Sequence, residues 1–399
     1  MKKIILLTFS LWAMSGICMA QDIYTAGSFV NAFGQTGSAV FKNGEVIFGK
    51  IEAGKELVSS AMAFDTLNGD IYWASSSNLI GDINYGYGCV MKNNEVLLDN
   101  VLGTRINDIS FDGNDLYSAG FTNGFYESIA AVWKNGETTP MYTYDLGTRS
   151  EVLGVVAVDG VVYACGYYTS GLDYGCVWRN GELYASYPNK RVTSITYADH
   201  DIYYMVEDFS GLVYISGQIY CNLYTNSTYT LATNDIKVAN GDIYVLGFMG
   251  FNDCCVWKNC ELVYLHPFAR EADFTACYYC DQSLYYVGYD HEDHGIIFKD
   301  GEQIASTKYQ YYYDVIVRPN PLTVKETNTE NITVYPSPAK NNIVIKGIAK
   351  GTLIHIYNTT GQLVMTAMAD SNNEIEVSHL PSGLYMVRCD EHVARFVKE

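Results

Sequence analysis

The stretch AAVWKNGE, residues 130–137, decides the fold because the chain repeats it at regular intervals. A second element recurs beside it, as in DLYSAG (115–120) and DIYVLG (242–247), and the Tyr residues of its seven copies are 40 to 48 residues apart. Seven copies at this period indicate a repeat architecture built from four-stranded units. The related copies of the first element are AVFKNGE (39–45), CVMKNNE (89–95), CVWRNGE (176–182), CVWKNCE (255–261), IIFKDGE (296–302) and a degenerate ISGQIY near Gly217.

Each repeat carries the signals of four short strands. In the third repeat, INDISF (106–111), LYSAGF (116–121), AAVWK (130–134) and the residues around Met141 to Tyr144 alternate β-branched or aromatic residues with turn residues. Asn-Gly supplies the two positive-φ positions of a tight type I′ hairpin. The Trp or Phe before it is expected to fill the space between neighbouring repeats. The repeated motif is therefore predicted to be structural rather than catalytic.

The two ends of the repeat region complement each other. The first repeat begins directly at its DIY strand, and the missing preceding strand is found at the far end as YYYDVIV (311–317). A sheet assembled from both ends would close the ring and cover two sheet edges. We therefore predict an all-β fold, with a seven-bladed β-propeller over residues 21–318. The weak fifth repeat leaves a six-bladed ring as the alternative.

The N-terminus predicts export. Residues 1–20 have the basic start, short apolar run and small residues of a cleavable signal peptide, and the run is too short to span a membrane. Lipid attachment at Cys18, as in a lipoprotein, is not expected, because such sites have a small residue before the cysteine and this chain has Ile17. No other segment predicts a transmembrane span. Removing the leader takes away Lys2 and Lys3 and no acid, so the formal net charge of −19 becomes −21. This charge argues against nucleic acid and anionic membranes as partners.

Ten cysteines follow the leader, and an exported chain permits disulfides. Three of them occupy a repeat position that is Ala in other copies, which predicts small buried residues: Cys89, Cys176 and Cys255. Four others lie within a single repeat, where one or two disulfides are plausible: Cys254, Cys260, Cys277 and Cys280.

Residues 319–330 lose the repeat pattern and are expected to be a linker, and residues 331–399 predict a small β-sandwich. Four segments of this tail carry a resemblance: VYPSPA (334–339), IYNTTGQLV (356–364), LPSGLYMVR (380–388) and ARFVKE (394–399). The tail resembles the type A C-terminal sorting domain of proteins exported by the Bacteroidetes type IX secretion system. Its motif residues here are Pro336, Pro338, Gly361, Gly383 and Tyr385, with Ser337 where members usually have Asn.

This resemblance implies the destination of the chain. It implies export across the inner membrane and a periplasmic stage. The type IX machinery would then be a partner during translocation across the outer membrane. Removal of the tail would accompany anchoring at the outer-membrane surface or release. The repeats also resemble blades of large secreted Bacteroidetes propeller proteins and, distantly, kelch repeats, a likeness that concerns the fold alone.

The loops between the DIY strand and the WKNGE strand are expected to share one face and to form the binding surface. Aromatic rings that can stack on sugars stand there beside carboxylates that can accept from hydroxyls, so glycan binding is the first hypothesis. Ordinary hydrated hairpins, protein recognition and cation binding are the alternatives. The first loop, FVNAFGQTGS, has aromatic residues but no carboxylate. The candidate ligand-binding residues are Asp82, Tyr85, Tyr87, Tyr126, Glu127, Asp173, Tyr174, Asp208, Asp253 and Asp290.

The loop YDHEDHG (289–295) offers metal-ligand chemistry through Asp290, His291, Asp293 and His294, and calcium is the cation considered. No other cofactor is expected. The sequence lacks a GxSxG elbow, an HExxH motif and a phosphate-binding glycine loop. A glycosidase would need two facing carboxylates, which sequence cannot select. We therefore interpret the chain as a secreted binding or scaffold module. A glycosidase or lyase, and a protein-adhesion or surface-structural module, are the rival interpretations.

Overall fold

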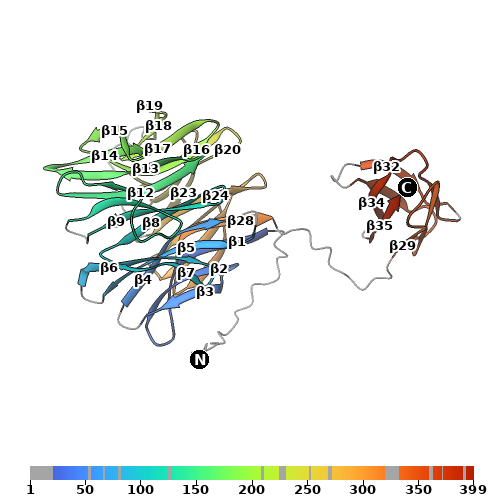
Figure 1. Ribbon diagram of the computed structural model, residues 1–399, viewed down its shortest axis with the longest axis horizontal. Coiled ribbons are helices and arrows are strands. Elements are labelled where there is room, and N and C mark those ends of the chain that lie inside the picture. Colours follow the sequence, from blue (N-terminus) through green and yellow to red (C-terminus); the bar gives the residue numbers. More distant parts are fainter. Residues whose placement is uncertain are drawn as a thin grey trace. The chain divides into compact units, whose positions relative to one another are not determined.

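The computed structural model describes residues 21–319 and 332–399, with short gaps at 53–54, 66–67, 80–81, 124–126, 208–210, 224–230, 251–252, 268–271, 359–362, 371 and 390–391. The predicted signal peptide and nearly all of the predicted linker lie outside the described residues. The chain divides between Asn320 and Pro321 into two compact units, a repeat unit and a C-terminal unit. Every helix or strand assigned in the described residues is a β-strand (Figure 1). None of these residues forms a helix suited to crossing a membrane.

The repeat unit contains seven four-stranded antiparallel sheets, numbered here along the chain. In spatial order their strands are β28 (Gln310–Pro319), β1 (Gln21–Val30), β2 (Thr36–Lys42), β3 (Glu45–Ile51) in sheet 1; β4 (Lys55–Phe64), β5 (Ile71–Leu79), β6 (Asp82–Lys92), β7 (Glu95–Leu102) in sheet 2; β8 (Arg105–Asp112), β9 (Asp115–Thr122), β10 (Ile129–Lys134), β11 (Tyr142–Tyr144) in sheet 3; β12 (Arg149–Val158), β13 (Val161–Ser170), β14 (Leu172–Arg179), β15 (Glu182–Pro188) in sheet 4; β16 (Arg191–Ala198), β17 (Asp201–Glu207), β18 (Leu212–Ile215), β19 (Gln218–Asn222) in sheet 5; β20 (Leu231–Ala239), β21 (Asp242–Met249), β22 (Asp253–Lys258), β23 (Glu261–Pro267) in sheet 6; and β24 (Asp273–Cys280), β25 (Ser283–Tyr289), β26 (His294–Lys299), β27 (Glu302–Lys308) in sheet 7.

The first strands of these sheets pack against one another in sequence. Contacts run from β4 through β8, β12, β16, β20 and β24 to β28, and β28 in turn contacts β4. Sheet 1 joins both ends of the repeat region, since Asp22 of β1 pairs with Arg318 of β28. The result is a propeller-like arrangement of successive sheets (Figure 1).

A β-bulge in every first strand shapes the centre of this arrangement. Each first strand shifts register against its second strand, as between Ile106 and Asp108 in sheet 3. The glycine that ends DLYSAG lies opposite the bulge. A Cβ on Gly120 would stand 1.9 Å from the carbonyl oxygen of Arg105, so only glycine fits there. The repeated glycine is therefore a packing requirement.

The residue after the bulge ties neighbouring sheets together where it is Asp. Asp314 accepts from the N–H of Val315 and, at 2.7 Å, from the N–H of Met62 in the next sheet. Asp108 accepts in the same way from Val155 at 2.8 Å, and Asp235 from Cys277 at 3.0 Å. These carboxylates satisfy amide groups that would otherwise lack partners at the sheet boundary.

The repeated KNGE turn is structural, as predicted. Asn135 and Gly136 have φ of 52° and 73°, the positive values of a type I′ turn. The Asn135 side chain accepts from the N–H of Leu116 and donates to Asp115, both at 2.8 Å. The degenerate copy keeps the same geometry, with Ser216 and Gly217 at 44° and 91°. Residues equivalent to Asn135 make the corresponding pair of bonds at Asn43, Asn93 and Asn259.

The tryptophan before the turn fills the space between sheets, which confirms the second part of that prediction. Trp178 of β14 is 1% exposed and stacks on Tyr144 of sheet 3, with ring centroids 4.5 Å apart. Trp133 of β10 packs in one buried cluster with Ala61 and Tyr72 of sheet 2. The cysteines at the Ala-like repeat position are buried and take part in no disulfide, as expected.

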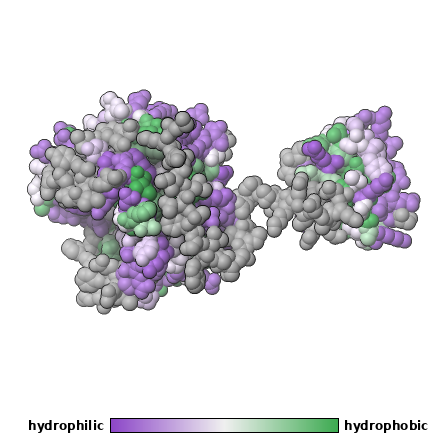
Figure 2. All heavy atoms as spheres, turned by 90° about the horizontal axis from the view of Figure 1, so that it is seen from below, coloured by the Kyte–Doolittle hydropathy of each residue, from purple (hydrophilic) through white to green (hydrophobic). Residues whose placement is uncertain are grey.

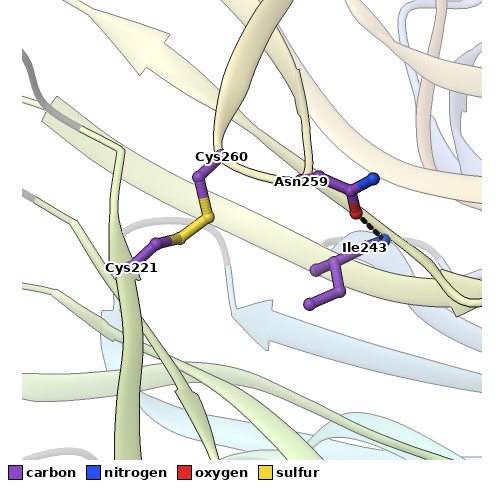
Figure 3. Close-up of a disulfide and its surroundings, with 4 residues drawn as sticks. All are labelled: Cys221, Ile243, Asn259 and Cys260. Atoms are coloured by element: carbon purple, nitrogen blue, oxygen red, sulfur yellow. Dashed lines mark hydrogen bonds between the residues drawn. A yellow bond between two sulfur atoms is a disulfide. The ribbon is translucent and has the colours of Figure 1, made fainter.

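The disulfide prediction was partly wrong. Cys260 bonds to Cys221 of the preceding repeat and not to a cysteine within its own repeat (Figure 3). The bond joins the outer strand β19 to the turn between β22 and β23, where Cys260 replaces the usual Gly with φ of 71°. Cys254, Cys277 and Cys280 are free thiols. The repeat alignment could not reveal this pair because Cys221 lies in the degenerate fifth repeat.

The C-terminal unit contains two sheets around one buried core. The first has the order β29 (Thr333–Tyr335), β30 (Asn342–Lys346), β33 (Glu374–Glu376), and the second β32 (Leu363–Met368), β31 (Leu353–Tyr357), β34 (Gly383–Cys389), β35 (His392–Lys398). Ile343 and Ile345 from the first sheet share that core with Ile354 and Phe396 from the second.

The sorting-motif residues occupy defined places in this unit. Tyr385 is 6% exposed, stacks on Phe396 with ring centroids 5.5 Å apart, and donates to the carbonyl of Pro381 at 2.8 Å. Gly383 begins β34, and Pro336 and Pro338 follow β29. Gly361 lies outside the described residues. The motif positions that are described thus belong to β34 and to the connection between β29 and β30 of the first sheet.

Candidate functional site

The two ends of the strands in the repeat unit differ in their connections. The tight turns between first and second strands and between third and fourth strands share one end, here called the turn end. The connections between second and third strands, and from each fourth strand to the next sheet, share the other, here called the loop end. The described candidate ligand-binding residues belong to segments at the loop end or to strands that lead into it. Figure 2 shows a largely hydrophilic face of the repeat unit crossed by a narrow hydrophobic strip.

The structure describes some of the predicted ligand residues and not others. Glu127 is exposed, and the Tyr87 ring lies 4.0 Å beneath the Lys55 ammonium group. Asp253 begins β22 and is half-buried. The side chains of Asp82, Tyr85, Tyr126 and Asp208 lie outside the described residues.

Asp173 and Tyr174 meet their neighbours in a compact polar group. The Asp173 carboxylate accepts from Thr169 at 2.8 Å and from Arg191 of sheet 5 at 2.7 Å. Burial alone would raise the pKa of this carboxyl, but the bonds from Arg191 and Thr169 outweigh it and lower the pKa. Tyr174 stacks on Tyr168 with ring centroids 4.9 Å apart and 8° between planes. The carboxylate oxygens of Asp173 therefore already accept hydrogen bonds from partners within the fold.

The predicted metal residues form a structured loop. Asp290 accepts from the backbone N–H of Glu292 at 2.9 Å and of His294 at 3.1 Å, and it lies 3.3 Å from the His294 imidazole. Asp293 accepts from the Tyr311 hydroxyl at 2.6 Å. Within the part of the chain that the structure describes, no group of three or more His, Cys, Asp or Glu side chains could hold a metal ion.

Three tyrosines of sheets 1 and 7 meet at the loop end, and two exposed aromatic residues, Phe33 and Tyr309, lie on the adjoining segments that backbone hydrogen bonds connect. These five residues are here called the aromatic corner: Phe33, Tyr289, Tyr309, Tyr311 and Tyr313. Tyr289 ends β25, and its ring centroid lies 5.8 Å from those of both Tyr311 and Tyr313, near the start of β28. Phe33 and Tyr309 are 77% and 48% exposed. Ring contacts thus join Tyr289 of sheet 7 to two tyrosines of sheet 1.

Backbone bonds hold the exposed members of the corner in place. Asn31 accepts through its side chain from the N–H of Phe33 at 2.9 Å and of Gln35 at 3.0 Å, which fixes the loop that presents Phe33. Tyr309 has φ of 61°, donates its N–H to the carbonyl of Asp293, and accepts from the N–H of Val30 at 3.0 Å. The non-glycine residue is thus held in an unfavoured backbone conformation by bonds from two loops.

Charged groups meet on the first strands beside the corner. Burial raises the pKa of Tyr313, whereas a hydrogen bond with Ser28 and the charge of Arg105 in sheet 3 lower it and the charge of Asp273 in sheet 7 raises it. Burial also raises the pKa of Asp273 to about 6, although Asn234 donates to its carboxylate at 2.5 Å. The neighbourhood of Tyr313 therefore combines a cation, an acid and an amide from three other sheets.

A second charged group lies among the bulges. The Lys237 ammonium stands 3.5 Å from Asp235, and the attraction of Asp235 is the main reason that its pKa is raised. Burial raises the pKa of Asp314 to about 7 and of Asp108 to about 6, while Lys237 acts against both shifts. Although 39% of the Lys237 side chain is exposed, it interacts with carboxylates from three sheets. These charged side chains therefore help to join the sheets.

The C-terminal unit can be assigned by comparison with known families. Residues 333–399 match the family described as secretion system C-terminal sorting domain. The tail is a type IX sorting domain. A protein with this sorting domain is exported and reaches the cell surface or the extracellular space. The described core of the sorting domain contains Tyr385, one of the residues on which the resemblance was based.

Three solved structures are similar to large parts of the chain at low identity. A computationally designed protein, Ika8, is 14% identical with a TM-score of 0.40, covering 85% of this chain and 96% of its own. PorZ, a surface component of the type IX secretion system of Porphyromonas gingivalis, is 11% identical with a TM-score of 0.35, covering 94% and 74%. The WD40 β-propeller domain of Doa1 is 11% identical with a TM-score of 0.44, covering 72% and 88%. No curated protein matches the chain.

The sequence interpretation missed Tyr309, Tyr311 and Tyr313 as site residues. They belong to the start of the closing strand and not to a loop between second and third strands, where binding residues were sought. Arg105 and Asp273 were missed for the same reason, since both begin first strands. The Tyr-rich run YQYYY (309–313) was the available signal.

Proposed function

We propose that this chain is a type IX-exported, seven-bladed β-propeller that binds glycans through its loop end. The seven four-stranded sheets and the cyclic contacts of their first strands support the closed ring. The proposed organisation is a propeller over residues 21–318, a linker over 319–330 and a β-sandwich sorting domain over 331–399. Release or anchoring at the outer-membrane surface follows passage through the type IX machinery.

The observation that carries glycan binding is the aromatic corner. Exposed apolar side chains that lie close together often mark an interaction site, and here the exposed residues are held by specific hydrogen bonds. The carboxylate of Asp293 stands beside them as a hydrogen-bond acceptor for hydroxyl groups. Binding sites commonly combine such apolar surfaces with a few fixed polar groups.

A glycan array probed with the full chain lacking its leader, residues 21–399, tests this function. The array is run with and without calcium, because the loop 289–295 was considered as a cation site. Reproducible binding to one glycan class, reduced by substitutions at the loop end, is the expected result. A silent array under both conditions would overturn glycan binding. Protein partners at the cell surface would then become the leading hypothesis.

A further inference from the structure

The charges and ring geometry of the aromatic corner restrict its ligand more closely. Resting on the proposed glycan-binding function, we infer that the aromatic corner is the primary sugar subsite and that it takes uncharged hexopyranose residues. It lies where sheet 7 meets sheet 1, the sheet that both ends of the repeat region build together.

The rings of the corner meet at steep angles and do not stack face to face on one another. The planes of Tyr311 and Tyr313 make angles of 64° and 56° with the plane of Tyr289. In such an arrangement one ring turns its edge toward the other, so the two rings do not cover each other completely as parallel stacked rings do. A pyranose ring presents a patch of C–H groups that packs against an aromatic face, and its hydroxyls point outward to polar neighbours. Tyr311 and Tyr289 are half-buried, so each retains accessible surface.

The exposed rings are fixed before a ligand arrives. Phe33 sits at the tip of a loop closed by hydrogen bonds from the N–H groups of Gly34 and Asn31 as well as by the Asn31 side chain. Tyr309 is held by the bonds to Asp293 and Val30. A site whose backbone is already ordered loses less entropy on binding, which favours weakly interacting ligands such as sugars.

The polar groups of the corner favour hydroxyls and disfavour anions. The Tyr311 hydroxyl donates to one oxygen of Asp293, so the other oxygen can accept from a sugar hydroxyl. Burial and the Asp293 charge raise the pKa of Tyr311 to about 12, so the hydroxyl keeps its proton at neutral pH. The charged groups facing the corner are the acids Asp273, Asp290, Glu292 and Asp293 and the bases Arg105 and Lys308.

The acidic excess around the corner sets the ligand class. A carboxylate or sulfate on the sugar would approach several carboxylates at short range, which is repulsive. The net charge of the whole chain adds to this repulsion at longer range. Uronates, sialylated glycans and sulfated glycans are therefore disfavoured, and neutral hexose glycans are the expected ligand class.

The test compares variants of the full chain, residues 21–399, on immobilised neutral hexose oligosaccharides and on uronate- and sulfate-bearing oligosaccharides of equal length. Phe33→Ala and Tyr309→Ala should each weaken binding to the neutral set by about tenfold, because each removes one exposed ring. Tyr311→Phe keeps the ring and loses the bond to Asp293, so a smaller loss of about threefold is expected. Tyr220→Ala is the matched control, since Tyr220 of β19 is 50% exposed on an outer strand away from the loop end.

The possible outcomes separate this inference from the broader function. If Phe33→Ala and Tyr309→Ala bind like the wild type while Tyr174→Ala loses binding, glycan recognition stands and the aromatic corner is the wrong site. A wild-type preference for the uronate or sulfate set overturns the ligand class. If the wild type binds nothing, the proposed function itself fails. Circular dichroism of each variant identifies any loss of binding that comes from misfolding. If an Ala variant misfolds, Tyr311→Phe, which removes only one hydroxyl, still tests the site.

Discussion

The turn end and the loop end of the repeat unit are built from the same strands, yet they are organised differently. At the turn end, Asn43, Asn93 and Asn135 make the same two side-chain bonds in three successive sheets. At the loop end, several described contacts belong to one pair of sheets each, such as Arg191 with Asp173 and Tyr311 with Asp293. The positions that recur maintain the sheets, and the positions that differ are available for recognition.

The largest expected effect at the turn end comes from the disulfide. Replacing Cys221 and Cys260 with Ser should lower the free energy of unfolding by about 2–4 kcal/mol, because the cross-link limits the freedom of the unfolded chain. Urea unfolding of the full chain measures the loss. A reductant should bring the wild type to the midpoint of the variant and leave the variant unchanged. Equal wild-type midpoints with and without reductant would contradict this expectation.

The repeated asparagine gives the next largest effect, and one turn contains its own control. Asn93→Ala removes the acceptor of the Ile71 N–H and the donor to Asp70, so a loss of about 1–3 kcal/mol in unfolding free energy is expected. Asn94→Ala, one residue later and exposed, should change it little. If the two substitutions lower the unfolding free energy equally, the side-chain hydrogen bonds of Asn93 do not stabilise the turn.

Between the two ends, the carboxylates at the bulges predict a pH dependence. Burial raises the pKa of Asp314 to about 7 in the folded chain, and the ordinary value for Asp is about 3.9. The folded state therefore holds this proton more tightly. The stabilisation is fully present below pH of about 4 and is lost as pH rises through about 7.

Asp314→Asn isolates this contribution. Unfolding free energies measured from pH 5 to pH 8 should decline by on the order of 1 kcal/mol more in the wild type than in Asp314→Asn. Lys237, Asp108 and Asp235 face the same group and are present in both proteins. Parallel profiles would show that Asp314 does not titrate in this range.

The smallest effect is expected at the loop end. Arg191→Gln removes an ion pair whose side chains are 44% and 32% exposed, so a loss of about 0.2–1 kcal/mol is expected. The difference from the wild type in urea unfolding should shrink as salt is added. If Arg191→Gln lowers the unfolding free energy more than Asn93→Ala does, the loop end contributes as much to stability as the turn end, which contradicts the comparison.

The sequence predicted the parts of the fold that recur and missed those that occur once. Repetition predicted the Asn-Gly turn, the Trp between sheets and the pairing of β1 with β28, because a residue that recurs across the repeats indicates a backbone conformation or contact that recurs too. The Cys221–Cys260 bond did not, since it joins two residues that differ from the repeat pattern. The tail was assigned from spaced motifs such as LPSGLYMVR, whose Tyr385 is a core residue.

The candidate site was harder to predict because its residues come from different kinds of segment. Phe33 lies on a loop of the expected type, whereas Tyr309 and Tyr311 begin the closing strand. Their proximity to Tyr289 depends on how sheet 7 meets sheet 1, which no local pattern encodes. Periodicity locates strands along the chain, but contacts between sheets depend on the ring as a whole.

The pairing of β1 with β28 also determines when the repeat unit can be completed during synthesis. A chain synthesised from its N-terminus contains β1 from the start, but the strand that pairs with it is added last, just before the linker and the sorting domain. Until then the edge of β1 is open, and such long-range pairing forms slowly. A chain interrupted before residue 310 lacks both the closing strand and the tail. Possession of the export tail therefore guarantees that every strand of the repeat unit has already been made.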